Sequence, residues 1–153
     1  MDKEYLEKII RELFEHTACS ISDLRFEDEA GMSWCLISTP DSRFLIGREG
    51  EALRSLNHLV KKMIETKYGE EASRSLMIDI NGYQKKHFDN LKATAHMLAE
   101  RARYFKSSIE AEPMSAYERR IIHLFLEDAK DIKTESIGMG KDRKVVIKYI
   151  ENI

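Results

Sequence analysis

The sequence predicts an α+β fold made of two modules with different topologies. Apolar residues recur at steps of three and four in residues 2–16, 51–68, 83–106 and 115–128, which is typical of amphipathic helices. Short β-prone stretches lie between these helices and are bounded by glycine, asparagine or proline. The order of helices and strands differs between the two halves, so two separate small sheets, each packed against its own helices, are expected.

In the first half the expected order is helix, two strands, short helix, long helix, strand. Residues 21–26 and 33–38 predict an antiparallel hairpin around a turn with glycine. Asp41 or Ser42 suits the N-cap of the short helix. Leu76, Ile78 and Ile80 alternate with Ser75, Met77 and Asp79, which predicts a third strand. A three-stranded sheet with its helices on one face is the simplest arrangement of these elements.

The second half begins with the longest helical pattern, residues 83–106, which contains no glycine or proline and is expected to connect the two modules. The Ser-x-x-Glu spacing at 115–118 predicts a capping box at the start of the next helix. A weak strand over 107–112 and a hairpin of 132–137 and 144–150 complete a small sheet with two helices.

Composition and charge exclude several classes of protein. The 153 residues carry a formal net charge of −2, with −5 on residues 1–80 and +3 on residues 81–153, so a polyanion would meet local basic patches and bind in a salt-sensitive way. No segment is apolar enough to span a membrane, and the first residues lack the pattern of a signal peptide. Cys19 and Cys35 have no partner spacing for a metal or a disulfide framework, so a cytoplasmic protein is expected.

The first candidate site is the Gly47-Arg48-Glu49-Gly50 turn, which opens into a helix. Two glycines let the backbone turn sharply and leave room for a ligand, and the N–H groups at a helix N-terminus favour an anion. Arg43 before the turn, Arg48 within it and Arg54 one helical turn later add positive charge. This pattern predicts a cradle for a phosphate backbone. A simple corner between two helices is the alternative that the motif alone leaves open.

The second candidate site is the pair Arg119 and His123, which stand at i and i+4 and so project from one face of their helix. A guanidinium and a protonatable ring on one face suit a phosphate or a base. Two alternatives remain open: Arg119 in an ordinary surface ion pair, and His123 bonded only to a neighbouring strand.

Taken together, these motifs resemble a known pair of domains. Residues 42–60, with the GxxG turn between two helices, resemble a KH domain of the bacterial type (type II). The stretch 117–123, with its Arg-x-x-x-His pattern, resembles the R-3-H domain. Their order resembles the Jag family, also called KhpB or EloR, the SpoIIIJ-associated RNA-binding proteins of bacteria. The resemblance covers a KH domain at 1–82 and an R-3-H domain at 83–153, of which 83–106 is the connecting helix; members often carry a further N-terminal domain.

The resemblance implies binding of single-stranded RNA, with single-stranded DNA as a second ligand, and no catalysis, cofactor or metal. A KH loop clamps about four nucleotides. Ile46, Leu53 and Leu56 are candidates for an apolar floor under the bases, with a core role equally open. The nucleic-acid-binding residues expected from the motifs and the resemblance are Gly47, Arg48, Glu49, Gly50, Arg43, Arg54, Arg119, Arg120, His123, Arg143 and Lys144.

The same resemblance leaves a second function open, a protein–protein adaptor that has kept both folds without significant RNA binding. The acidic first helix and Glu49, whose carboxylate stands beside the expected phosphates, favour it. The family's association with a membrane-protein insertase and with cell-envelope growth implies a protein partner from that pathway, or one from the KH family, without membrane insertion of this chain.

Overall fold

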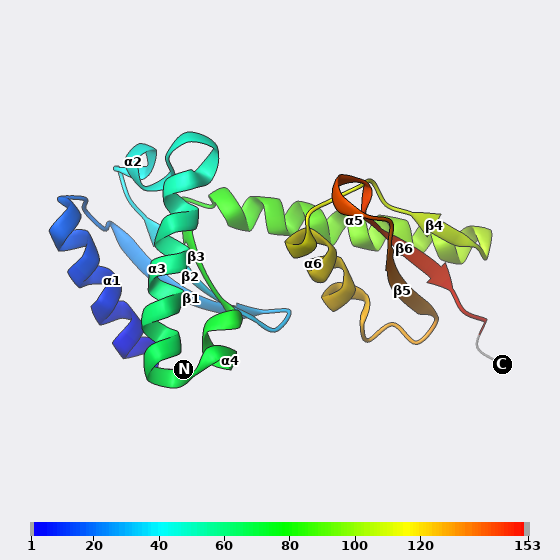
Figure 1. Ribbon diagram of the computed structural model, residues 1–153, viewed down its shortest axis with the longest axis horizontal. Helices are drawn as coiled ribbons and strands as arrows, with labels where there is room; N and C mark the ends of the chain where they lie inside the picture. The colour runs from blue at the N-terminus through cyan, green and yellow to red at the C-terminus, as the bar shows by residue number, and fades with distance from the viewer. Residues whose placement is uncertain (1, 152–153) are drawn as a thin grey trace. The chain divides into compact units, whose positions relative to one another are not determined.

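The structure is a computed structural model that describes residues 2–151. The chain forms two compact units, one ending at Lys85 and one beginning at Lys86, and each is described by itself (Figure 1). Both are small α+β units with a three-stranded sheet, which confirms the predicted fold class. The helix expected to connect the modules contributes its first three residues, 83–85, to the first unit and the rest to the second.

The first unit follows the predicted order of elements, with one short helix added. The sheet order is β1-β2-β3, with β1 and β2 antiparallel and β2 and β3 parallel. The added helix, α4, is short and highly charged, so it has no apolar periodicity to reveal it. The elements are α1 (Lys3–Thr17), β1 (Asp23–Glu29), β2 (Met32–Ser38), α2 (Ser42–Ile46), the 3-10 turn η1 (Arg48–Gly50), α3 (Glu51–Tyr68), α4 (Glu70–Arg74) and β3 (Leu76–Ile80).

The core of this unit lies between the helices α1 and α3 and one face of the sheet (Figure 1). Leu53 of α3 is fully buried there, which places it in the core, whereas Ile46 and Leu56 are half-buried against it. All five residues of β3 are buried, and four of them are apolar. The polar residue Asp79 is buried because its carboxylate accepts hydrogen bonds from the backbone N–H of Gln84 (2.6 Å) and Lys85 (3.3 Å) at the start of the next helix.

A buried amide fixes α3 against the edge of the sheet. Asn57 accepts a hydrogen bond from the N–H of Ile78 (2.8 Å) and donates one to the carbonyl of Ile78 (2.9 Å), as a neighbouring strand would. The same amide nitrogen also donates to Leu53 O (3.1 Å). Buried backbone groups need such partners. Because α3 is held in this way, the loop at its N-terminus has a defined position relative to the sheet.

Asp41 differs in detail from its predicted role. It occupies the N-cap position of α2, but its side chain makes no capping bond. Its carboxylate instead accepts from the backbone N–H (2.8 Å) and the hydroxyl (3.1 Å) of Ser20. Tertiary contact has replaced local capping here, and it ties the segment before β1 to the segment after β2.

The second unit packs two helices on a wholly antiparallel sheet of order β4-β6-β5. The capping box at Ser115 and Glu118 is confirmed, because each side chain bonds the other's backbone N–H. Arg103 binds Asp131 with two hydrogen bonds (2.6 and 2.9 Å) and so ties the end of α5 to the loop before β5. The elements are α5 (Tyr83–Phe105), β4 (Ser108–Glu110), α6 (Ala116–Leu126), β5 (Ile132–Ile137), the 3-10 turn η2 (Gly140–Asp142) and β6 (Lys144–Tyr149).

Residues 2–151 contain neither a helix that could span a membrane nor a cluster of side chains that could hold a metal ion. None of the helices in this range has the length and apolar content needed to cross a membrane. Within the same range, no group of three or more histidine, cysteine or acidic side chains is placed to hold a metal ion.

Candidate nucleic-acid interface

The loop of the first unit needs both of its glycines. Gly47 (φ 72°) and Gly50 (φ 77°) adopt left-handed backbone conformations. A Cβ on Gly47 would lie 2.8 Å from the Cβ of Ala52, and a Cβ on Gly50 would lie 2.9 Å from the ring of Tyr83. Glu49 between them also has a positive φ of 52°, which is unfavourable for a residue with a side chain. The loop therefore keeps a tight, partly strained shape.

Two backbone donors of this loop, which belong to exposed residues, are left open. The N–H of Gly47 donates to Arg43 O, that of Gly50 to Gly47 O and that of Glu51 to Arg48 O. In the part of the chain that the structure describes, the N–H groups of Arg48 and Glu49 have no acceptor. These donors lie directly before the 18-residue helix α3, whose dipole favours a negative charge at that end. A phosphate group fits this arrangement of donors.

The arginines around the loop have different surroundings. Arg43 on α2 and Arg48 in the turn are exposed side chains. Arg54 donates from Nη1 to the carbonyl of Glu49 (2.7 Å), so it both braces the loop and keeps its charge beside it. The side chain of Glu49 is exposed as well. Positive charge therefore exceeds negative charge at this end of α3.

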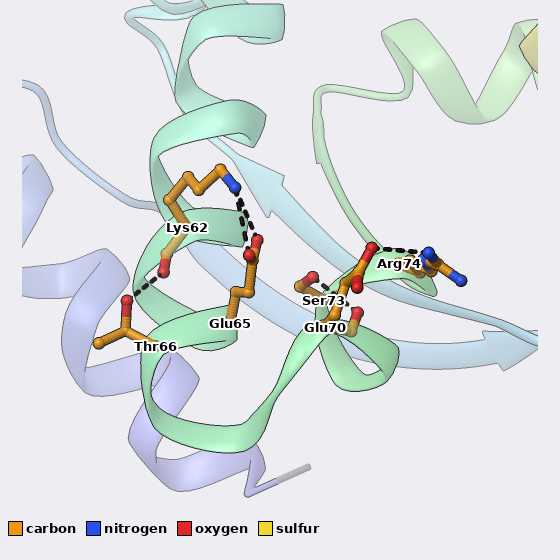
Figure 2. A network of polar contacts seen from close by, with 6 residues as sticks. All are labelled: Lys62, Glu65, Thr66, Glu70, Ser73 and Arg74. Atoms are coloured by element: carbon orange, nitrogen blue, oxygen red, sulfur yellow. Dashed lines mark hydrogen bonds and ion pairs between the residues drawn. The ribbon is translucent and has the colours of Figure 1, made fainter.

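The positive charge does not continue unpaired along α3. Figure 2 shows that Lys62 pairs with Glu65 (2.9 Å) near the C-terminal end of the helix, where Thr66 also bonds the Lys62 carbonyl. On the following α4, Arg74 pairs with Glu70 (2.6 Å; Figure 2). Exposed ion pairs of this kind reduce the local positive electrostatic potential, even though they add little to the stability of the fold. The basic patch is thus centred on the GxxG loop.

In the second unit, His123 faces the sheet. Its Nδ1 lies 2.7 Å from the hydroxyl of Thr134 and its Nε2 lies 2.9 Å from the hydroxyl of Ser136, both on β5. Burial lowers the pKa of His123 below its usual value, and the neighbouring Arg119 lowers it further. The ring is therefore held in its neutral form at neutral pH, and its direct partners are two hydroxyl groups of this strand.

Arg119 lies between two shallow depressions on the surface of the second unit. It donates from Nη1 to the carbonyl of Met114 (2.8 Å), which orients the guanidinium. The first depression is lined by Arg119 and Arg120 together with His123 and its hydroxyl partners. The second lies at the N-terminus of α6, where Lys141 and Arg143 join Arg119. A guanidinium and a helix N-terminus that face the same space form a second potential anion site.

Lys144 is the predicted site residue that lies apart from these depressions. Its ammonium group pairs with Glu110. The two residues lie on β6 and β4, adjacent strands of the sheet, so this side chain bridges them rather than lining either depression.

Comparison with known proteins shows which proteins this chain is similar to. The sequence profile of the R-3-H domain matches residues 89–149. The RNA-binding protein KhpB of Clostridium symbiosum is 30% identical over 144 residues, which cover 94% of this chain and 63% of the relative. The KhpB protein of Bacillus subtilis is 32% identical over 115 residues, 74% of this chain and 54% of the relative. The chain therefore contains an R-3-H domain and is a homologue of proteins named KhpB over most of its length.

The relationship to KhpB covers only part of the relatives. The chain spans 63% and 54% of the length of the two KhpB proteins named above, and one third of the KhpB protein of Streptococcus pneumoniae, which is 28% identical over 111 residues. The R-3-H match includes Arg119, His123, Thr134 and Ser136. The KH assignment of the first unit rests on the GxxG loop and the order of its elements.

Three residues next to the site were missed by sequence reasoning. Thr134 and Ser136, the partners of His123, stand two apart on β5 and so share one face, which is a pattern that alternation could have revealed. Tyr83 follows the Asn-Gly turn after β3, and its contact with Gly50 depends on tertiary structure. No local signal indicates that contact.

Proposed function

We propose that this homologue of KhpB binds single-stranded RNA through two anion sites, one in each unit. The observation that carries the proposal is the pair of unpaired N–H groups of Arg48 and Glu49 at the N-terminus of α3, flanked by Arg43 and Arg54. Backbone donors and arginines recognise phosphate without reading a base, so binding is expected to be tolerant of sequence.

In the second unit, the proposed contacts come from Arg119, with Arg120 and Arg143 beside it. We propose for His123 a role other than direct contact with the ligand, because both of its ring nitrogens face hydroxyl groups. We propose that it orients Thr134 and Ser136 on the wall of the depression, and that these hydroxyls contact the nucleic acid. When one strand reaches both units, linkage raises the effective concentration of the second contact.

Fluorescence anisotropy with a labelled single-stranded RNA tests the proposal. Binding through about three to four phosphates predicts a loss of roughly 20- to 50-fold in affinity between 50 and 200 mM salt. Arg48→Asp is expected to weaken binding about tenfold and to reduce the salt slope by about 0.7. Arg119→Ala is expected to weaken it independently.

Arg74→Asp is the matched control, because it makes the same change of charge in the same unit but at a residue that pairs with Glu70 on α4. It should leave the affinity within twofold of wild type. Equal effects of Arg48→Asp and Arg74→Asp would indicate a nonspecific charge effect. No binding by the wild type at low salt would refute the proposal.

A protein–protein adaptor is the second candidate function, and Glu49 is the observation that favours it, because its exposed carboxylate stands within the loop. A protein partner from the KH family or from a membrane-insertase pathway, and a link to cell-envelope growth, stay predictions of the resemblance. Co-purification of the full chain with and without ribonuclease treatment separates the two functions. A partner that stays bound after the treatment supports the adaptor.

A further inference from the structure

Tyr83 has an unusual place beside the GxxG loop. It is the first residue of α5, and its ring fills the space that a side chain at position 50 would occupy. The atoms nearest to that position are Cε1 (2.9 Å), the hydroxyl oxygen (3.3 Å) and Cζ (3.4 Å). The hydroxyl-bearing edge of the ring therefore faces the loop, so Tyr83 presents a hydrogen-bonding group there.

The position of Tyr83 is fixed by its neighbours in the chain. Asn81 (φ 50°) and Gly82 (φ 79°) form a tight turn directly after β3. The buried carboxylate of Asp79 then accepts from the N–H groups of Gln84 and Lys85 and so anchors the first turn of α5. A residue held between a turn and a capped helix end has little freedom, so its ring stays beside Gly50.

The hydroxyl of Tyr83 is available for a ligand. The side chain is 46% exposed, and within residues 2–151 its hydroxyl makes no hydrogen bond. A tyrosine hydroxyl both donates and accepts, and at neutral pH it carries a proton. The open N–H groups of Arg48 and Glu49 lie in the same loop. Among the described residues, the loop and its immediate neighbour Tyr83 therefore offer three donors without a partner: two from the backbone and one from a side chain.

We propose that the Tyr83 hydroxyl donates a hydrogen bond to the nucleic-acid phosphate held by the GxxG loop, an inference that rests on the proposed function. Tyr83 is then a binding residue contributed by the start of α5, after the last strand of the first unit. The contact also gives a reason for glycine at position 50, since any larger residue there would displace the ring.

Tyr83→Phe tests the contact, because it keeps the ring against Gly50 and removes only the hydroxyl. With a labelled oligouridine of about 12 nucleotides, several times the length that one KH loop clamps, the affinity is expected to fall about tenfold, as for loss of a hydrogen bond to a charged group. Because the hydroxyl is neutral, no counterion is released through it, and the salt slope should stay unchanged. This separates Tyr83→Phe from Arg48→Asp, which lowers the slope.

Two controls complete the experiment. Tyr68→Phe makes the same change at a 36% exposed tyrosine at the far end of α3, and it should leave the affinity unchanged. Oligodeoxyuridine of the same length should show the same fold-loss for Tyr83→Phe as the RNA does, since both have phosphates. The melting temperature of Tyr83→Phe should match that of the wild type.

If Tyr83→Phe binds RNA as tightly as the wild type while Arg48→Asp binds it more weakly, this inference is overturned. The proposed function still stands in that case. A loss seen with RNA but not with DNA would assign the contact to the 2′-hydroxyl and contradict the phosphate. If the wild type binds neither oligonucleotide at low salt, the proposed function fails and this inference fails with it.

Discussion

Glu49 offers a test in which stability and binding respond to different features of one side chain. Its φ of 52° is a conformation that costs a residue with a Cβ roughly 1–2 kcal/mol. Glycine adopts this conformation without that cost but loses about 0.5–1 kcal/mol more conformational entropy on folding. Glu49→Gly is therefore expected to stabilise the first unit by about 0.5–1 kcal/mol, which corresponds to a rise in Tm of roughly 2–8 °C for a domain of this size.

The effect of Glu49→Gly on binding follows from its charge. A carboxylate about 5 Å from a phosphate in water is repelled by about 0.8 kcal/mol at low salt, so its removal should lower Kd by a factor of about 4. Glu49→Gln is the matched control, since it removes the charge and keeps the positive φ. The control should share the gain in affinity but show no gain in Tm.

Thermal unfolding followed by circular dichroism and RNA anisotropy at low salt provide the two measurements. An equal Tm for Glu49→Gly and Glu49→Gln would refute the assigned backbone strain. Unchanged affinity in both variants would show that the carboxylate lies away from any bound phosphate, and it would contradict the placement of the phosphate at the loop.

Three further predictions concern the fold around the two sites. Asn57→Leu leaves the buried N–H and carbonyl of Ile78 without partners, so urea denaturation should show a loss of about 2–5 kcal/mol; a loss below 1 kcal/mol would contradict the role of the amide. The pKa of His123 is lowered in the folded state, so this group's contribution to stability is complete above about pH 6.5 and is lost as the pH falls below it. His123→Gln should flatten the pH dependence of the free energy of unfolding below about pH 6.5, and an unchanged slope would show that this histidine is not its source. Burial raises the pKa of Cys35 to about 12, and the negative charge of Glu7 adds a smaller effect. A thiol reagent at pH 8 should therefore label only Cys19 in the native protein and both cysteines in urea. Rapid labelling of both thiols in the native protein would contradict this burial.

Much of the fold was predictable because its signals are local. The periodicity of residues 2–16 predicted α1, and the Ser-x-x-Glu spacing at 115–118 predicted a capping box that the structure contains. The turn at Ala30 and Gly31, which both have positive φ, joins the two strands of the predicted hairpin. In each case the residues that determine the structure lie within a few positions of one another.

The features that could not be predicted from the sequence depend on contacts between residues that are distant in the chain. Asn57 is a polar residue in an amphipathic helix and is typical of a surface position, but it pairs with β3, 21 residues away. His123 stands on one helix face with Arg119, yet its ring nitrogens are directed to hydroxyl groups on β5. Tyr83 contacts Gly50 across 33 residues of chain. These contacts become visible only once the sheets are assembled.

The central claim is that the open N–H groups of the GxxG loop bind a phosphate, and the amide chemical shifts of Arg48 and Glu49 report on this directly. In an NMR titration of the full chain with oligouridine, the amide protons of both residues should move downfield and show the largest changes in the first unit. The amide of Arg74 on α4 should stay in place. If Arg48 and Glu49 shift no more than Arg74 while RNA is bound, the phosphate lies elsewhere and the account of this loop is wrong.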